Sequence, residues 1–279
     1  MPKKLSISEQ LLHSTIRIES EYKDNSNGVG TGFFFQFNYA ENARCPVIVT
    51  NKHVVSNAQK GSLLFTVCDE NGDPDFTSKF SWTIENFEKF WRCHPDQQID
   101  LCVMPIAPLL QGMSEKNKKP FFKCVDKTLI PSKDEFDELF AVEDVVMIGY
   151  PIGLWDSANN LPIIRKGVTA THPAFKYNNK REFMIDVACF PGSSGSPVFL
   201  YNSQGYVSRK GNFLGTSRLK LLGILYGGPQ YSVNGTIEVV NVPTQHVPVA
   251  RASIPMNLGC VVNSQVLLDF EEIFKPPTT

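Results

Sequence analysis

Short apolar segments separated by clusters of turn-forming residues recur along most of this chain. In the first half, the apolar segments cover only a few positions each, and Gly, Asn, Asp and Pro residues gather between them, as in ENGDPD at 70–75. Short apolar or alternating runs bounded by such turn residues are typical of β-strands, and their regular spacing is typical of an antiparallel barrel. We expect strands at 15–20, 32–37, 46–50, 62–68, 80–83 and 100–105.

The alternation of apolar and polar residues stops after residue 107 and returns near residue 142. A chain of 279 residues is long for one compact core but suits two barrels. We therefore predict an all-β protein of two antiparallel six-stranded β-barrels with a C-terminal helix. The expected segments are an N-terminal turn or helix at 1–14, a first barrel at 15–107, a linker at 108–141, a second barrel at 142–262 and a helix with a tail at 263–279.

Composition narrows the function classes. The formal net charge is −1, and the only run of basic residues is the KNKK segment at 116–119, so we expect no nucleic acid partner. No apolar run is long enough for a signal-peptide core or a membrane span, so we expect a cytoplasmic protein without a membrane partner. The seven cysteines are scattered and include no CxxC pair, so we expect reduced thiols, no metal and no cofactor.

The segment PGSSGSPVF at 191–199 contains the first candidate catalytic residue, a serine. A serine hydroxyl is a poor nucleophile at neutral pH, so it needs a neighbouring base and backbone N–H donors for the oxyanion that forms. Ser194 is the candidate nucleophile, and the N–H groups of Gly192 and Ser194 are the candidate oxyanion hole, because Gly192 and Gly195 allow an unusual turn. A Gly/Ser-rich surface loop is the alternative for the segment on its own.

One of the five histidines has the surroundings of a general base. His53 follows the apolar segment PVIVT at 46–50, which would hold the imidazole at the end of a rigid strand. Asp100 begins the later apolar segment, where its carboxylate could accept a hydrogen bond from His53 Nδ1–H. The other four are less suitable: His13, His94, His172 and His246.

An α/β-hydrolase is the main alternative for a Gly-Xaa-Ser motif. That fold requires the order serine, acid, histidine. After Ser194 the only histidine is His246, and the only acid between them is Glu238, which is too close to His246 in sequence. We therefore set this alternative aside.

Several motifs together resemble the chymotrypsin-fold serine peptidases. TGFFFQF at 31–37, VVMIGYP at 145–151 and IDVACFPGSSGSP at 185–197 are similar to segments of the bacterial HtrA-type and glutamyl-endopeptidase-like branch, without a PDZ domain. The resemblance extends from about residue 15 to residue 262, strong in the motifs and weak in the loops. It implies a catalytic triad of His53, Asp100 and Ser194, in that order.

The resemblance also implies where a substrate binds. GILYGG at 223–228 is similar to the strand that pairs with substrate main chain in this superfamily, although a simple Gly-Gly hairpin end would look the same. The pocket floor would have Ala188 where trypsin-type enzymes carry an acid, and Asp186 is expected to have a structural role. An apolar pocket favours small or medium apolar side chains before the scissile bond. The residues expected at this site are Ala188, Cys189, Tyr226, Gly227 and Gly228.

The function that we predict from the sequence is a serine endopeptidase acting on protein or peptide substrates through an acyl-enzyme intermediate. The alternative is a catalytically silent module of the same fold that binds extended peptides or a protein partner. A regulatory protein partner would fit either prediction.

Overall fold

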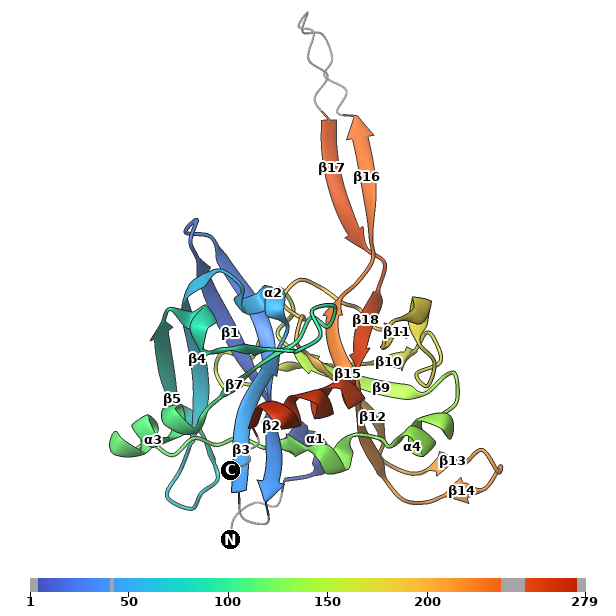
Figure 1. Ribbon diagram of the computed structural model, residues 1–279, viewed down its shortest axis with the longest axis horizontal. Coiled ribbons are helices and arrows are strands. Elements are labelled where there is room, and N and C mark those ends of the chain that lie inside the picture. The colour runs from blue at the N-terminus through green and yellow to red at the C-terminus, as the bar shows by residue number, and fades with distance from the viewer. Residues whose placement is uncertain (1–4, 41–42, 237–248, 275–279) are drawn as a thin grey trace, which may run out of the picture.

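The computed structural model describes residues 5–40, 43–236 and 249–274. Two β-structures, one from each half of the chain, lie against each other (Figure 1). Strands of the first are β1 (Thr15–Tyr22), β2 (Asn27–Ala40), β3 (Ala43–Thr50), β4 (Ala58–Cys68), β5 (Pro74–Glu85), β6 (Arg92–Cys93), β7 (Cys102–Pro105) and β8 (Val125–Asp126). Strands of the second are β9 (Asp144–Gly149), β10 (Ile163–Thr169), β11 (Glu182–Asp186), β12 (Pro197–Asn202), β15 (Arg218–Gly227) and β18 (Leu258–Asn263).

The helices are short and lie at the edges of these two structures. The α-helices are α1 (Ile7–Leu12), α2 (Lys52–Val55), α3 (Ala107–Glu115), α4 (Lys133–Asp137) and α5 (Glu271–Phe274). The 3₁₀ turns are η1 (Phe87–Phe90), η2 (Lys127–Leu129), η3 (Pro151–Gly153), η4 (Tyr177–Asn179) and η5 (Ser264–Phe270). In the described residues, no helix combines the length and apolar character needed to cross a membrane.

The second β-structure is the closed barrel that the sequence predicts. Its six strands follow the order β10-β11-β18-β15-β12-β9, and all its pairings are antiparallel. Large apolar side chains fill its interior, and they include Met147, Phe183, Val198, Leu222 and Val261. The all-β fold class is confirmed.

The first β-structure differs from the predicted closed six-stranded barrel. Its strands form one sheet in the order β5-β4-β1-β2-β3-β7-β6, and β8, from the segment expected to be a linker, pairs with β2. Within the described residues, β5 and β6 do not pair. Asn86 takes a left-handed φ of 53° directly after β5, and η1 follows, so only Arg92 and Cys93 are left to form β6. The domain boundaries stay predictions.

The C-terminal helix covers a core that both halves share. η5 packs Val266, Leu267 and Phe270 against side chains from β2 and from the second barrel, such as Phe35 and Phe199. The sequence predicts one helix over this stretch, whereas the structure has a 3₁₀ turn followed by the short α5. This helix therefore joins the two halves of the chain.

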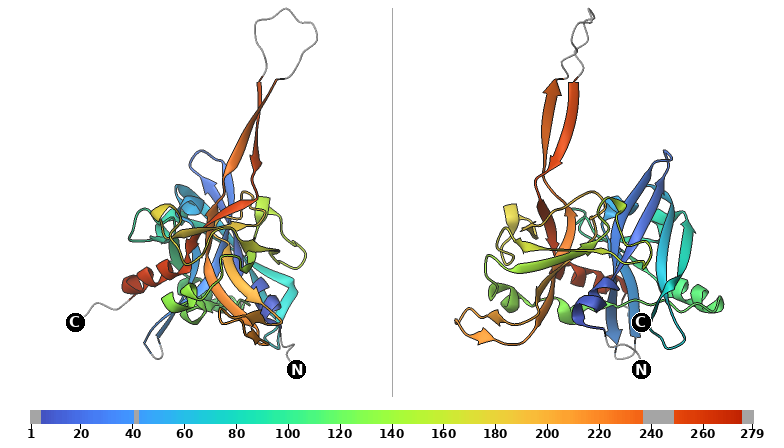
Figure 2. Two further views of the ribbon diagram at one scale, coloured as in Figure 1. Left: turned by 90° about the vertical axis from the view of Figure 1, so that its right-hand side faces the viewer. Right: turned by 180° about the vertical axis from the view of Figure 1, so that it is seen from behind.

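Two hairpins extend from the second barrel. The polar segment at 202–218 contains the short strands β13 (Tyr206–Val207) and β14 (Phe213–Leu214), which pair with each other. The sequence interpretation missed β16 (Gln230–Thr236) and β17 (Val249–Pro255), which pair with each other and project away from both β-structures (Figures 1 and 2). Glu238 and His246, which the α/β-hydrolase alternative needs, lie outside the described residues.

His13 gives the fold a predicted dependence on pH. The residue is 6% exposed and its ring packs edge-to-face on Phe121, with centroids 4.8 Å apart. Burial, and then the Lys123 cation, lower the pKa of His13 to about 4. The unfolded chain, with an ordinary histidine pKa of about 6.5, binds this proton more readily than the folded chain does. Folding stability should therefore fall as the pH drops from about 6.5 to about 4, by up to about 3 kcal/mol.

Urea unfolding at pH 7 and pH 5 measures this dependence. His13→Leu removes the titrating group while keeping an apolar side chain, so this variant should lose less stability over that interval than the wild-type protein. Equal losses in both proteins would show that His13 does not cause the acid sensitivity.

Candidate active site

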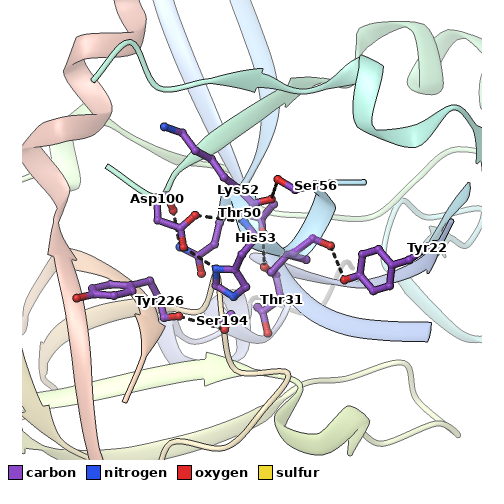
Figure 3. A network of polar contacts seen from close by, with 11 residues as sticks. Tyr22, Thr31, Thr50, Lys52, His53, Ser56, Asp100, Ser194 and Tyr226 are labelled. Atoms are coloured by element: carbon purple, nitrogen blue, oxygen red, sulfur yellow. Dashed lines mark hydrogen bonds and ion pairs between the residues drawn. The ribbon is translucent and has the colours of Figure 1, made fainter. Parts of the chain in front are cut away.

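His53 follows β3 and Asp100 precedes β7, and the two residues meet at one end of the first sheet. β3 ends at Thr50, and Asn51, in an extended conformation, starts the short helix α2 that carries His53. His53 Nδ1 lies 2.5 Å from Asp100 Oδ2, and the backbone N–H of His53 donates to Asp100 Oδ1 at 3.2 Å (Figure 3). Asn51 Nδ2 donates to the Asp100 carbonyl at 2.7 Å. Both carboxylate oxygens therefore hold the histidine in one orientation.

A buried histidine fixes the loop that leads to Asp100. The side chain of His94 is 0% exposed, and its Nε2 lies 3.1 Å from the Val266 carbonyl and 3.3 Å from Asp269 Oδ2. The N–H of Asp96 donates to His94 Nδ1 at 3.0 Å, so Nε2 is the ring nitrogen left to donate. Val266 and Asp269 belong to η5. This part of the C-terminal helix therefore holds the loop that carries Asp100 in place.

Thr31 on β2 holds the serine segment against the first sheet. Its N–H donates to the Ser194 carbonyl at 2.9 Å, and its Oγ1 donates to the Gly192 carbonyl at 3.0 Å. At Gly195, with φ of +87°, an added Cβ would lie 1.9 Å from the Thr31 carbonyl, so only glycine fits there. The two halves of the chain therefore meet at the candidate nucleophile.

The turn before Ser194 leaves two backbone donors free. Gly192 has a φ of +86°, and the Pro191 carbonyl accepts a hydrogen bond from the N–H of Ile152 at 2.5 Å. Within the described part of the chain, neither Gly192 N–H nor Ser194 N–H donates to a protein acceptor. Two unpaired donors next to a serine hydroxyl have the composition of an oxyanion hole.

Ile152, the residue that holds this turn, has an unusual conformation. It has a φ of 51°, in the left-handed region that disfavours β-branched residues, and it is 63% exposed. An unfavourable backbone conformation persists only where the surrounding structure determines it, and here the bond to the Pro191 carbonyl does so.

Ser194 lies beside His53 without a hydrogen bond to it. In Figure 3 the His53 ring lies between the Asp100 carboxylate and the Ser194 side chain. Ser194 Oγ donates to the Tyr226 carbonyl at 3.3 Å, which is the side-chain hydrogen bond it makes among the described residues. Catalytic hydrogen bonds are often long or poorly aligned before substrate binds, so this geometry is compatible with a base that takes the Ser194 proton.

A pocket of about 180 Å³ opens beside Ser194. Three of the five predicted pocket residues line it: Cys189, Gly227 and Gly228. The sequence interpretation missed the others in its lining: Phe190, Pro191, Leu225, Pro229 and Gln230. Burial raises the pKa of the Cys189 thiol to about 12, so this wall is uncharged at neutral pH.

The other two predicted residues, Ala188 and Tyr226, do not line this pocket. The Ala188 carbonyl accepts a hydrogen bond from Arg165 Nη1 at 2.8 Å, and the Arg165 guanidinium lies 5.0 Å from the centroid of the Phe190 ring. The Tyr226 hydroxyl donates to Glu182 Oε2 at 3.0 Å, so this residue offers the site its carbonyl and directs its ring elsewhere.

Asp186, which the sequence places near the pocket floor, lies exposed at the end of β11. The Arg165 guanidinium lies over Phe190 of the pocket wall, and among the residues that the structure describes no carboxylate lines the pocket. Within the described ranges, no group of three His, Cys, Asp or Glu side chains could hold a metal ion.

Gly192→Ala tests the free oxyanion donors. An added Cβ at Gly192 would lie 2.5 Å from the Tyr150 carbonyl, so the turn must move and its N–H with it. We expect a loss of about 10² to 10³ in kcat, the size seen when one oxyanion donor is removed. The matched control is Gly72→Ala, because Gly72 has a similar φ of +84° but nothing within 4 Å of an added Cβ. Equal kcat values for the two variants would contradict the oxyanion role.

Comparison with known proteins identifies the family of this chain. No curated protein matches the chain. Among solved structures, the chain is similar to "HtrA-type protease AlgW with tripeptide", at 12% identity and a TM-score of 0.44. That match covers 94% of this chain, which spans only 60% of the other. Residues 30–207, more than half of the chain and including His53, Asp100 and Ser194, match the trypsin-like peptidase domain family. The chain therefore belongs to the trypsin-like peptidase domain family.

Proposed function

We propose that the protein is a serine endopeptidase that hydrolyses peptide bonds in proteins or peptides. The observation that carries this proposal is the contact of 2.5 Å between His53 Nδ1 and Asp100 Oδ2, next to a serine whose segment has two free backbone donors. A carboxylate bound to Nδ1 keeps the proton on that nitrogen and leaves Nε2 to accept the proton of Ser194.

The proposed reaction has two stages. Ser194 Oγ attacks the scissile carbonyl while His53 takes its proton, and the Gly192 and Ser194 N–H groups stabilise the oxyanion. His53 then protonates the leaving amine, and an acyl group remains on Ser194. Water, activated by the same histidine, releases the acyl group and restores the enzyme. No cofactor takes part in these steps.

The pocket beside Ser194 predicts the preferred residue before the scissile bond. Its glycines and its uncharged Cys189 favour small or medium apolar side chains such as Ala, Val and Leu. The Arg165 cation behind Phe190 disfavours Lys and Arg. Mass spectrometry of a digested peptide library should show cleavage after apolar residues, and a dominant preference for Lys or Arg would contradict this account of the pocket.

Pre-steady-state kinetics with an activated ester test the proposed reaction. We expect a burst of one leaving group per protein molecule, followed by slower turnover, because an acyl group accumulates on Ser194. Ser194→Ala should give no burst. A wild-type protein that behaves like this variant would rule out the acyl-enzyme route.

A second candidate function is a catalytically silent module that binds extended peptides. It is favoured by one observation, the hydrogen bond of Ser194 Oγ to the Tyr226 carbonyl instead of to His53. Such a module would bind a peptide equally well with or without the serine hydroxyl, would never cleave it, and would show no burst.

A further inference from the structure

Two cysteines lie directly opposite each other at the base of the loop that carries Asp100. Cys93 on β6 and Cys102 on β7 are paired in the antiparallel register. The N–H of His94 donates to the Leu101 carbonyl at 2.9 Å, so the next pair along, Cys93 and Cys102, is a non-hydrogen-bonded pair. In such pairs the Cα atoms are about 4.5 Å apart and both side chains point to the same face.

This position suits a disulfide bond. Disulfides join cysteines whose Cα atoms are about 4.4–6.8 Å apart, a range that includes the distance of about 4.5 Å in such a pair. The two strands can therefore keep their register when the bond forms. Cys93 is exposed to solvent and Cys102 is buried. All seven cysteines lie in the described residues, and Cys93 alone among them is exposed. The pair therefore combines an accessible thiol with a partner directly opposite.

The pair is adjacent to the proposed catalytic residues. Cys102 follows Asp100 by two positions, and on its other side β7 pairs it with Thr50, the last residue of β3 before the helix of His53. The pKa of the Cys102 thiol is raised well above its usual value, first by burial and then by Cys93 and Asp100, with Lys52 acting in the opposite direction. Cys93 is therefore the thiol that reacts first, and Cys102 the thiol that completes the bond.

Resting on the proposed function, we propose that Cys93 and Cys102 form a reversible disulfide under oxidising conditions, which displaces Asp100 and lowers turnover. The co-reactant is a low-molecular-weight disulfide, for which glutathione disulfide is the probe. Such chemistry would place the peptidase under redox control through a site distinct from its pocket.

The exchange proceeds in two balanced steps. The Cys93 thiolate attacks one sulfur of glutathione disulfide, forming a mixed disulfide and releasing one glutathione thiolate. Cys102 then loses its proton to solvent and attacks the Cys93 sulfur, which forms the Cys93–Cys102 bond and releases the second glutathione. Two cysteine thiols are oxidised and one glutathione disulfide is reduced to two thiols. A thiol reductant reverses both steps.

Bond formation must shift the backbone near Asp100. Opposite residues have Cβ atoms about 4.5–5.5 Å apart, whereas a disulfide brings them to about 3.8 Å. Asp100 is two residues away, and its carboxylate makes two hydrogen bonds to His53 that depend on its position. A displacement of about 1 Å in a catalytic group can lower the rate by about 10²-fold. We expect oxidation to lower kcat by about 10-fold to 10²-fold.

The experiment uses the full chain, incubated with glutathione disulfide. Peptide mapping identifies the cross-link, hydrolysis of a chromogenic peptide gives kcat, and the proton resonance on His53 Nδ1 reports the contact with Asp100 without requiring activity. The wild-type protein should form the Cys93–Cys102 link, lose kcat, shift the His53 resonance and recover on reduction. Cys93→Ser and Cys102→Ala should do none of these, and the control Cys45→Ser should behave like the wild-type protein.

Two results would overturn the proposal. One is a mixed disulfide that stays on Cys93 without a link to Cys102. The other is a complete link that leaves the His53 resonance and kcat unchanged. If the reduced wild-type protein hydrolyses no peptide, the proposed function fails, while the cross-link and the His53 resonance still decide whether the pair acts on Asp100.

Discussion

Ser194→Ala should lower kcat by about six orders of magnitude, the effect of removing the nucleophile from a serine peptidase triad. In the proposed reaction the Ser194 hydroxyl oxygen attacks the substrate, so in this variant only the slow uncatalysed attack of bound water remains. The variant keeps the backbone donors at positions 192 and 194, and among the described residues the side-chain hydrogen bond that it loses is the one of 3.3 Å to the Tyr226 carbonyl. Its melting temperature should therefore stay close to that of the wild-type protein.

Steady-state hydrolysis of a chromogenic peptide measures this loss. The matched control is Ser196→Ala, because the Ser196 hydroxyl is buried two residues away without a hydrogen-bond partner among the described residues. That variant should keep a kcat within tenfold of the wild-type value. A Ser194→Ala protein with more than a hundredth of the wild-type rate would remove Ser194 from the reaction.

Asp100→Asn should lower kcat by about four orders of magnitude while the fold is kept. The asparagine amide can occupy the place of the carboxylate, but its N–H donates to His53 Nδ1 and forces the ring proton onto Nε2. The nitrogen that faces Ser194 then cannot accept the serine proton. The contact of 2.5 Å between Nδ1 and Oδ2 makes the tautomer depend on this residue.

The control for this substitution is Asp186→Asn, which removes an exposed carboxylate outside the pocket. We expect it to leave both kcat and the preference for apolar residues unchanged. Circular dichroism should show the same fold in both variants. A rate for Asp100→Asn within tenfold of the wild-type value would mean that Asp100 does not set the tautomer of His53.

The parts of the site that the sequence predicts are those held in single local segments. The apolar strand before His53, the apolar segment after Asp100 and the glycines around Ser194 each contain their own structural signal, so the residues could be selected without knowing how the strands pair. The structure brings His53 and Asp100 together and places Ser194 beside them (Figure 3). Their catalytic roles stay predictions until activity is measured.

The features that the sequence interpretation missed depend on contacts between distant segments. Thr31 holds the serine segment through its N–H and its hydroxyl, and Ile152 holds it through its N–H; all three donate to backbone carbonyls of that distant segment, which no local sequence pattern reveals. The motif TGFFFQF marks the strand correctly, but its resemblance did not show that Thr31 makes the contacts to the serine segment. The first sheet stays open because β6 has only two residues and does not pair with β5 among the described residues, and the sequence pattern did not show how short this strand is.

The lining of the pocket also depends on contacts that the sequence pattern does not reveal. Ala188 and Tyr226 lie next to pocket residues in sequence, but the Ala188 carbonyl accepts a hydrogen bond from Arg165, the Tyr226 hydroxyl donates to Glu182, and neither residue lines the pocket. The hairpin of β16 and β17 was missed because, among the described residues, these strands pair with each other and not with a strand of either β-structure, so a barrel pattern does not predict them.

Reaction of the intact chain with a fluorophosphonate probe tests the central claim, that Ser194 is an activated nucleophile. The probe bonds covalently to a serine only where a base takes its proton and donors stabilise the resulting oxyanion, and mass spectrometry identifies the labelled residue. We predict one label per chain, on Ser194, in the wild-type protein and none in Ser194→Ala. If the wild-type protein stays unlabelled and behaves as Ser194→Ala does, the chain is a peptide-binding module and the proposed catalytic function is wrong.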